Sequence, residues 1–389
     1  MLTRGLLLLN FLKTRGTVLA KLDSNNIFLF CFNTNFLKEK IFVSENNNKW
    51  LLGTAIGIGA IAALTLLGKK RRQFDFENKV VLITGGSRGL GLVLARELAK
   101  EGARLAICAR DGEELKRARE ELQTAGAEVF DVICDVREQE QVNRMIEDIN
   151  TRFGQIDVLI NNAGVIQVGP LEVQTQEDFE NALAIHFWAP FYTMQAVLPQ
   201  MKKRGAGRIV NIASIGAKVA VPHLAPYCAS KFALLGLSNA LRGELYKDNV
   251  FVTTVCPGLM RTGSHINAIF KGKKEIEYAL FSLMDALPLT SISAERAARQ
   301  IVESCRSGDA ELIITTQAKL AAKANALFPE TVAQIMGMVN QILPSAGGIG
   351  TSHALGKDST SFASPSILTA LADRASVRNN ELAPNEYLA

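Results

Sequence analysis

The chain of 389 residues is long enough for one large domain or two small ones, and it can bury a sizeable hydrophobic core. Its 48% hydrophobic and 21% charged residues are ordinary for a globular protein with an added apolar segment. The formal charge of +5 comes from residues 1–72, which hold eleven Lys/Arg and three Asp/Glu, whereas the remainder has a net charge of −3. The globular part therefore has no basic excess, which argues against a nucleic-acid partner.

The six cysteines are scattered and form no C-x-x-C pair; they lie at positions 31, 108, 134, 228, 256 and 305. Neither a disulfide framework nor a metal site is indicated by this spacing. We expect buried free thiols in a reducing compartment.

Residues 1–49 form a leader without a motif, and residues 50–68 form an uncharged run of nineteen residues. As a helix this run would be about 28 Å long, close to the ~30 Å hydrocarbon core of a bilayer. Trp50 begins it and four basic residues, 69–72, follow it, as at a membrane interface. The sequence predicts one transmembrane helix here, the alternative being a buried core helix.

A strand, a glycine-rich turn and a helix typical of dinucleotide-binding proteins follow at residues 79–100. The apolar run 79–84 predicts a buried strand, and it leads into Gly85, Gly86, Ser87, Arg88, Gly89, Leu90 and Gly91 and then an amphipathic helix. Glycines let the backbone approach a pyrophosphate, and the helix N-terminus offers free N–H groups and a positive dipole end.

Strands and helices then alternate along the chain. We expect strands at 104–109, 128–134, 157–161, 208–212, 251–256 and 311–315, and helices at 111–125, 138–153, 177–203 and 227–247. Apolar strands alternating with helices predict an α/β fold, a Rossmann-type doubly wound parallel sheet of about seven strands with helices on both faces. The catalytic domain is expected at residues 74–316, followed by a helical extension at 317–389.

Two arginines indicate which dinucleotide binds. Arg110 follows the second strand, where an acidic residue would contact a ribose 2′-hydroxyl, and Arg88 lies in the glycine turn. Arginine at these positions fits a 2′-phosphate, so we expect NADP(H) rather than NAD(H). The alternative is that both are ordinary surface arginines.

Ser214, Tyr227 and Lys231 have the spacing of an acid–base site. Tyr227 and Lys231 share a helix face, and a nearby cation favours the phenolate and so lowers the phenol pKa. A phenol tuned toward neutrality can exchange a proton with a carbonyl or alcohol, which Ser214 can hold.

With these residues the chain resembles the short-chain dehydrogenases/reductases over roughly residues 74–316. The motifs are T-G-G-S-R-G-L-G at 84–91, Asp135-Val136, N-N-A-G at 161–164, Ser214, Y-C-A-S-K at 227–231 and P-G-L-M-R-T at 257–262. The resemblance implies that Tyr227 is the acid/base, that Lys231 lowers its pKa and bonds the nicotinamide ribose, and that Ser214 orients the substrate. It also implies cofactor contacts by Asp135 and Val136, by Asn162, Ala163 and Gly164, and by Pro257, Gly258 and Thr262.

His186 departs from the family pattern. It stands where the family has an asparagine that holds a water linking the lysine to solvent. A histidine can hold that water or relay protons itself, or the relay can be impaired. A relay predicts that His186→Asn keeps activity but alters its pH profile.

The C-terminal extension is expected to contain a helix at 330–343, a flexible connector at 345–366 and a short helix at 367–377. The first helix carries an apolar stripe, which is typical of core packing; the other interpretation is a helix over the substrate cleft or on a bilayer surface. The resemblance further suggests a homodimer or homotetramer.

Apolar residues between 263 and 288 argue for an apolar, lipid-like substrate, unless they merely close the domain core. We therefore expect a single-pass membrane oxidoreductase that faces the cytoplasm, binds membrane lipid through 50–68 and interconverts a carbonyl and an alcohol. The alternative is a catalytically weak NADP(H)-binding sensor or scaffold at the membrane.

Overall fold

The computed structural model describes residues 12–14, 17–19, 32–33, 73–288, 290–361, 364–366 and 369–382. The chain divides into two compact units, residues 1–68 and 69–389. In the first unit the described residues form a small antiparallel sheet of β1 (Leu12–Thr14), β2 (Thr17–Leu19) and β3 (Phe32–Asn33). The predicted membrane segment 50–68 lies outside the described residues, and no helix among the described ones is long and apolar enough to cross a membrane.

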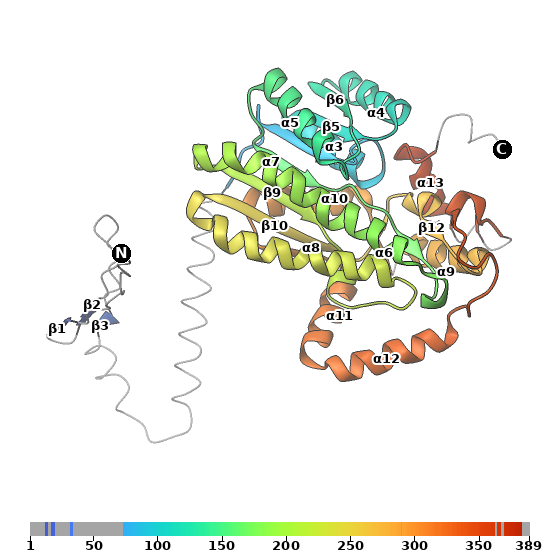
Figure 1. Ribbon diagram of the computed structural model, residues 1–389. Helices are drawn as coiled ribbons and strands as arrows, with labels where there is room; N and C mark the ends of the chain where they lie inside the picture. The colour runs from blue at the N-terminus through green and yellow to red at the C-terminus, as the bar shows by residue number, and fades with distance from the viewer. Residues whose placement is uncertain are drawn as a thin grey trace, which may run out of the picture. The chain divides into compact units, whose positions relative to one another are not determined.

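The second unit is organised around a seven-stranded parallel sheet of order β14-β10-β9-β7-β4-β5-β6 (Figure 1). Its strands are β4 (Val80–Thr84), β5 (Arg104–Ala109), β6 (Val129–Ile133), β7 (Val158–Asn161), β9 (Gly207–Ile212), β10 (Val250–Pro257) and β14 (Glu311–Ile314). The predicted α/β sheet is confirmed, with strand ends shifted by at most one residue.

Helices connect these strands, and those before residue 250 lie where they were predicted, whereas the two after it were not predicted. They are α3 (Gly89–Lys100), α4 (Gly112–Thr124), α5 (Gln139–Phe153), α6 (Gln176–Leu183), α7 (Ala189–Arg204), α8 (Ala225–Glu244), α9 (Lys274–Ala286) and α10 (Ala294–Ser307). The single long helix predicted at 177–203 is α6 and α7 joined by a π-helical turn, Ala184–Trp188. Such turns are often found at functional sites.

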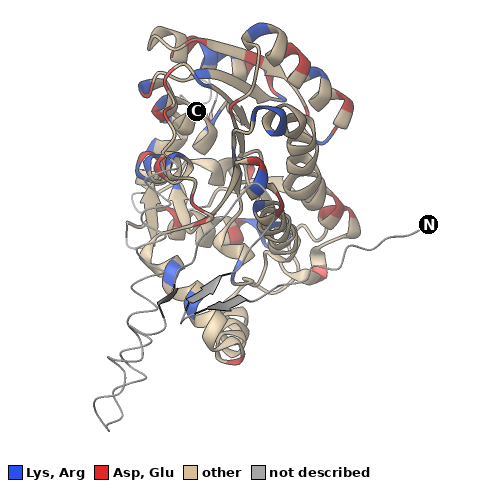
Figure 2. Cartoon of the chain, turned by 90° about the vertical axis from the view of Figure 1, so that its left-hand side faces the viewer, with Lys and Arg blue, Asp and Glu red and all other residues tan. Residues whose placement is uncertain are grey.

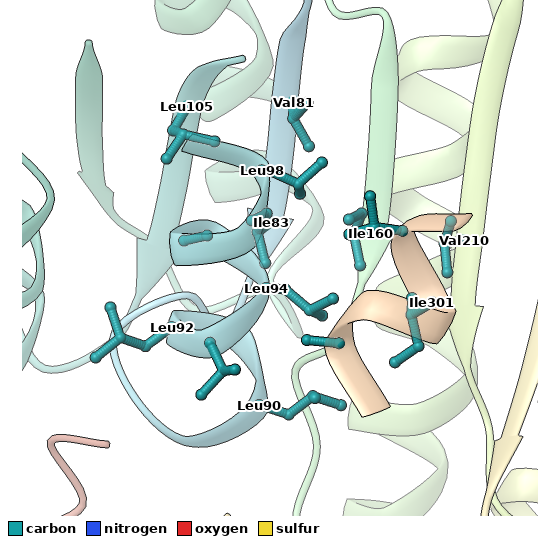
Figure 3. Close-up of a cluster of buried hydrophobic side chains, with 14 of the residues drawn as sticks. Val81, Ile83, Leu90, Leu92, Leu94, Leu98, Leu105, Ile160, Val210 and Ile301 are labelled. Atoms are coloured by element: carbon teal, nitrogen blue, oxygen red, sulfur yellow. The ribbon is translucent and has the colours of Figure 1, made fainter. Parts of the chain in front are cut away.

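The strands are apolar on both faces because helices cover both. Successive residues of β4 alternate between two buried clusters: Val81 and Ile83 pack on one face, Val80 and Leu82 on the other. Figure 3 shows the first cluster, in which leucines of α3 fill the space between the sheet and Ile301 of α10. This double burial fixes the carboxyl ends of the central strands, where the glycine turn and Ser214 emerge.

Smaller sheets close the carboxyl edge. β8 (Gln167–Val168), β12 (Ile269–Phe270) and β15 (Ala354–Leu355) form one, and β11 (Leu259–Arg261) pairs with β13 (Ser291–Ser293). The prediction of a flexible connector at 345–366 was wrong for its described residues, because β15 pairs with β12 and Gly272 N–H donates to Gly350 O at 3.1 Å.

The extension contains α11 (Thr316–Leu327), α12 (Pro329–Ile342) and α13 (Ala370–Arg378). The core-packing interpretation of the apolar stripe was wrong, because no residue of α12 is buried. Figure 1 shows α11 and α12 as an arm outside the layers of the sheet and its helices. Charges of both signs are interspersed over the described helices in the view of Figure 2, in keeping with the absence of a basic excess after residue 72.

Candidate active site

The predicted catalytic side chains lie where β9 and α8 meet. Ser214 follows β9 and caps the 3-10 turn Ile215–Ala217, and its Oγ accepts a backbone N–H of that turn at 3.0 Å. Because α8 begins two residues before Tyr227, that tyrosine lies in the first turn and Lys231 one turn later. Ser214 makes a hydrogen bond with the Tyr227 side chain, and Lys231 Nζ lies 5.7 Å from the centroid of the phenol ring. The structure thus brings the predicted triad together.

Burial shifts the pKa values of Tyr227 and Lys231, and it moves the phenol pKa in the opposite direction from the one predicted from the sequence. Enclosure of the hydroxyl raises the pKa of Tyr227 to about 12, and the hydrogen bond with Ser214 offsets only part of that rise. Burial also lowers the pKa of Lys231 to about 7, while Nζ donates to Ile212 O at 2.8 Å. The prediction of a lowered phenol pKa was wrong for these side chains, because exclusion of water disfavours both charged forms. At neutral pH Tyr227 therefore holds a proton that it can donate.

His186 lies in the π-helical turn beside Tyr227, with the two rings edge to face and 5.4 Å between centroids. The Val165 N–H can only donate, so His186 Nε2 accepts it at 3.2 Å, and Nδ1 carries the proton that faces Ser230 Oγ at 2.8 Å. Burial, followed by the charge of Lys231, lowers the pKa of His186 well below its usual value. The imidazole is therefore neutral, and its two hydrogen bonds connect the loop after β7 to α8. A neutral imidazole contradicts a proton relay that depends on protonation of His186.

We expect His186→Asn to keep the pH profile of activity between about pH 6 and 9, since a neutral imidazole does not titrate there. Loss of buried hydrogen bonds should lower the free energy of unfolding by about 1–3 kcal/mol. Urea denaturation of this variant and of His353→Asn, at an exposed histidine, supplies the comparison. A shifted activity profile with unchanged stability would restore the relay.

The glycine turn has the geometry of a dinucleotide cradle. Gly85 and Gly89 have φ angles of +63° and +54°, in the left-handed region that favours glycine. A Cβ on Gly91 would collide with the carbonyl oxygen of Gly85, so this glycine lets α3 approach the turn closely. α3 begins at Gly89, which directs its N-terminal N–H groups and positive dipole end toward the turn. These residues fit the pyrophosphate of a dinucleotide.

Asn162, Ala163 and Gly164 link the glycine turn to the catalytic group. Asn162 Nδ2 donates to the carbonyl oxygen of Thr84 at 3.0 Å, and the Ala163 N–H donates to Thr84 Oγ1 at 3.1 Å. A Cβ on Gly164 would lie 3.7 Å from Lys231 Nζ, so this glycine packs against the lysine predicted to be catalytic. The three predicted cleft residues therefore join both halves of the site.

Of the two arginines expected at the 2′-phosphate, one is bound by an acidic neighbour. Ser87 Oγ and Arg88 Nη1 donate to the Glu114 carboxylate at 3.2 and 2.7 Å. Arg110 is exposed directly after β5. A 2′-phosphate would have to compete with Glu114 for Arg88. Arg110 is exposed at the surface.

Asp135 and Val136, expected near the adenine, follow β6. Arg137 Nη2 donates to Asp135 Oδ2 at 2.6 Å, and this bond, with a smaller contribution from Arg110, keeps the pKa of the carboxyl below its usual value despite partial burial. Val136 is buried in the core on the α5 side of the sheet. Asp135 is therefore a charged, fixed carboxylate at the edge of the sheet where the adenine is expected.

The residues expected at the nicotinamide end follow β10. Pro257 is the last residue of that strand, and the Gly258 N–H donates to Ile314 O at 3.2 Å. Thr262 follows β11, is buried, and its Oγ1 donates to Ser264 Oγ at 2.9 Å. They lie along one loop, on the strand next to the one that leads to Ser214.

Two contacts of this site were not predicted. His223 Nδ1 lies 2.6 Å from Glu277 Oε1, which ties the loop before Tyr227 to α9. The residues after α13, Asn379–Leu382, reach the glycine turn and the Thr262 loop. No spacing or motif in the sequence connects residues near 380 to residues near 88.

Comparison with known proteins agrees with these motifs. Residues 79–269 match the short chain dehydrogenase family. A putative ketoacyl reductase of Streptomyces coelicolor is 39% identical over 188 residues, 48% of this chain and 72% of the relative. The putative oxidoreductase SadH of Mycobacterium tuberculosis is 34% identical over 276 residues, 70% of this chain and 96% of the relative. L-Sorbose reductase of Gluconobacter frateurii, solved with NADPH and L-sorbose, has a TM-score of 0.56 and 29% identity, covering 62% of this chain and 97% of its own.

Proposed function

Because this chain belongs to the short-chain dehydrogenase family, we propose that it is an NADP(H)-dependent oxidoreductase that interconverts a carbonyl and an alcohol on an apolar substrate. One observation carries the proposal: Ser214, Tyr227 and Lys231 meet beside a glycine turn with the geometry of a dinucleotide cradle. In the reduction direction Tyr227 would act as the general acid, and its raised pKa keeps the phenol protonated at neutral pH for that role.

In reduction, NADPH supplies the hydride that adds to the carbonyl carbon. Ser214 Oγ and the Tyr227 hydroxyl together hold the carbonyl oxygen and polarise it. Tyr227 then gives its proton to that oxygen as the carbon–oxygen double bond becomes an alcohol, and the phenolate regains a proton from solvent. Lys231, in its protonated form, stabilises the phenolate in the meantime.

The preference for NADP(H) is supported by Arg110 and by the NADPH in the solved L-sorbose reductase. Arg110 is the cation most open to a 2′-phosphate, because Arg88 is already bound to Glu114.

We expect Arg110→Ala to weaken NADPH binding by roughly tenfold to a hundredfold, the loss of a hydrogen bond to a charged group, and to leave NADH binding unchanged. Titration of both cofactors into this variant and into Arg299→Ala, on the exposed side of α10, measures the effect. Equal loss for NADPH and NADH would show that Arg110 does not recognise the 2′-phosphate.

An apolar substrate is supported by one face of α9. Leu280, Met284 and Leu287, spaced four and three residues apart, are 38%, 53% and 38% exposed. Ile266 and Phe270, from the same variable region, are instead buried and close a small core cluster or lie beside it. Part of the apolar residues between 263 and 288 therefore serves the core, and the rest remains available to a substrate.

A membrane location is part of the proposal. The uncharged segment 50–68 would anchor the chain in a single pass, with the catalytic unit on the cytoplasmic side. The exposed apolar face of α12 supports it: Ile335, Met338 and Ile342 are 43%, 59% and 81% exposed, and the helix carries a single charged residue, Glu330. Such a face suits the surface of a bilayer.

The test is NADPH oxidation with a panel of apolar ketones and aldehydes beside a polar sugar such as L-sorbose. We expect turnover with the apolar compounds. Turnover of the sugar alone would contradict the substrate class while keeping the reaction.

A further inference from the structure

The C-terminal tail, defined here as Asn379–Leu382, follows α13 and lies on the glycine turn. The Gly89 N–H, the first amide of α3, donates to Asn379 O at 2.9 Å. Asn380 Nδ2 donates to Ser87 O at 2.8 Å and to Glu114 O at 3.0 Å. The tail thereby uses backbone groups of the turn that is expected to receive a cofactor.

Glu381 places a carboxylate at the position that the motif keeps for the pyrophosphate. Its side chain is 3% exposed, Oε2 lies 3.3 Å from Arg88 Nε, and Asn267 Nδ2 donates to the same oxygen at 2.7 Å. A Cβ on Gly89 would collide with Glu381 Oε1. In a dinucleotide-binding turn, the glycine at the position of Gly89 has no side chain, which lets the pyrophosphate approach the backbone. Here the space beside it is filled by an anionic side chain at a helix N-terminus, which favours anions.

The tail also reaches the opposite end of the expected cofactor path. Asn379 Nδ2 donates to Thr262 O at 2.9 Å, while its Oδ1 accepts from Arg96 Nη1 at 2.9 Å. α13 is secured in turn, because Ser376 Oγ donates to Gly263 O at 3.0 Å. One asparagine therefore bridges the glycine turn and the Thr262 loop.

A pyrophosphate is expected to displace the Glu381 carboxylate from this position. Burial raises its pKa, and Arg88 offsets that effect only in part. A pyrophosphate offers more negative charge and more acceptor oxygens to the Gly89 N–H, which Asn379 O now accepts, and to the same arginine. The short tail can be exchanged for it without disturbing the sheet, because its contacts lie outside the two main core clusters.

We propose that the C-terminal tail is an autoinhibitory internal ligand: Glu381 occupies the pyrophosphate cradle, and NADP(H) binds only when the tail is displaced. This inference rests on the proposed cofactor site at the glycine turn. The apparent affinity for NADPH is then reduced by the fraction of molecules whose tail is released, and weakening the tail raises that fraction.

The test compares NADPH titrations of the full chain, of Glu381→Gln and of Glu330→Gln, a matched control on exposed α12. Glutamine keeps an acceptor for Asn267 and removes the charge that faces Arg88. We expect Glu381→Gln to bind NADPH roughly tenfold tighter than the other two proteins. Equal or weaker binding by Glu381→Gln, with an unchanged unfolding temperature, would overturn the proposal.

A second readout follows the tail itself. Trypsin can cut after Arg378, whose side chain is 57% exposed, and mass spectrometry detects release of the peptide that begins at Asn379. Saturating NADPH should speed this cleavage in the full chain, since it displaces the tail. Protection by NADPH would contradict autoinhibition and indicate a tail that closes over the cofactor. Failure of every protein to bind NADPH would instead refute the proposed function, so the two failures are distinguishable.

Discussion

Replacing Tyr227 with Phe should lower NADPH-dependent carbonyl reduction by about 10²–10⁴-fold, the usual contribution of a positioned general acid. The phenyl ring keeps the packing against His186 but has no proton to give. NADPH affinity should stay within about twofold, because the expected pyrophosphate and 2′-phosphate contacts are untouched. Initial rates and cofactor titrations on the same preparations measure both quantities.

Tyr246→Phe is the control for this comparison, because Tyr246 is 57% exposed and lies beyond the end of α8. It should reduce the same substrates at the wild-type rate. Equal rates for the wild type and Tyr227→Phe would remove the catalytic assignment and favour a cofactor-binding sensor or scaffold.

Replacing Lys271 with Met should lower the free energy of unfolding by about 3–5 kcal/mol, the usual cost of leaving one charge of a buried pair unpaired. Lys271 Nζ lies 2.6 Å from Asp178 Oδ2, and both side chains are buried. Burial alone would raise the pKa of Asp178, but the bonds from Lys271 and from the Thr175 backbone outweigh it and lower that pKa. The pair joins α6 to the residue that directly follows β12, so its loss should also loosen the small sheet beside the site.

Urea denaturation checks this second prediction against Lys202→Met, which removes a more exposed partner 3.9 Å from Asp248 and should cost less than about 1 kcal/mol. The double variant Lys271→Met/Asp178→Asn should regain part of the loss, since no buried charge remains unpaired. Equal losses in the free energy of unfolding for Lys271→Met and Lys202→Met would show that the buried pair stabilises the fold no more than the exposed one.

The sheet and the glycine turn were predictable because their signals are local. Residues 80–83 of β4 are apolar and face helix-covered sides, and the turn between Gly85 and Gly91 follows within the same thirteen-residue stretch, 79–91. The approach of Tyr227 and Lys231 was predictable for a related reason: a helix places residues four apart on one face. Ser214 lies outside this helix, and only the family resemblance joined it to them.

The protonation of the site was not predictable, because spacing reveals a neighbouring cation but not the exclusion of water. Tyr227 and Lys231 are near each other as expected, yet burial moves both pKa values away from the charged forms. His186 was found from the family pattern, but its role depended on Val165 and Ser230, whose approach only the fold reveals.

Two features could not be predicted from the sequence: the contact of the tail with the glycine turn and the exposure of α12. Glu381 and Gly89 are 292 residues apart, and no periodicity relates them. The stripe on α12 was visible, but a stripe does not say whether it is covered; in the structure no residue of the helix is buried.

The most direct test of the central claim is transfer of deuterium from carbon 4 of the nicotinamide of labelled NADPH to an apolar ketone. We expect the wild-type protein to form an alcohol with one deuterium on the carbinol carbon, and Tyr227→Phe to form it at a rate lower by about 10²–10⁴-fold while still binding NADPH. A protein that binds NADPH tightly yet places no deuterium on any ketone or aldehyde of the panel would contradict the account.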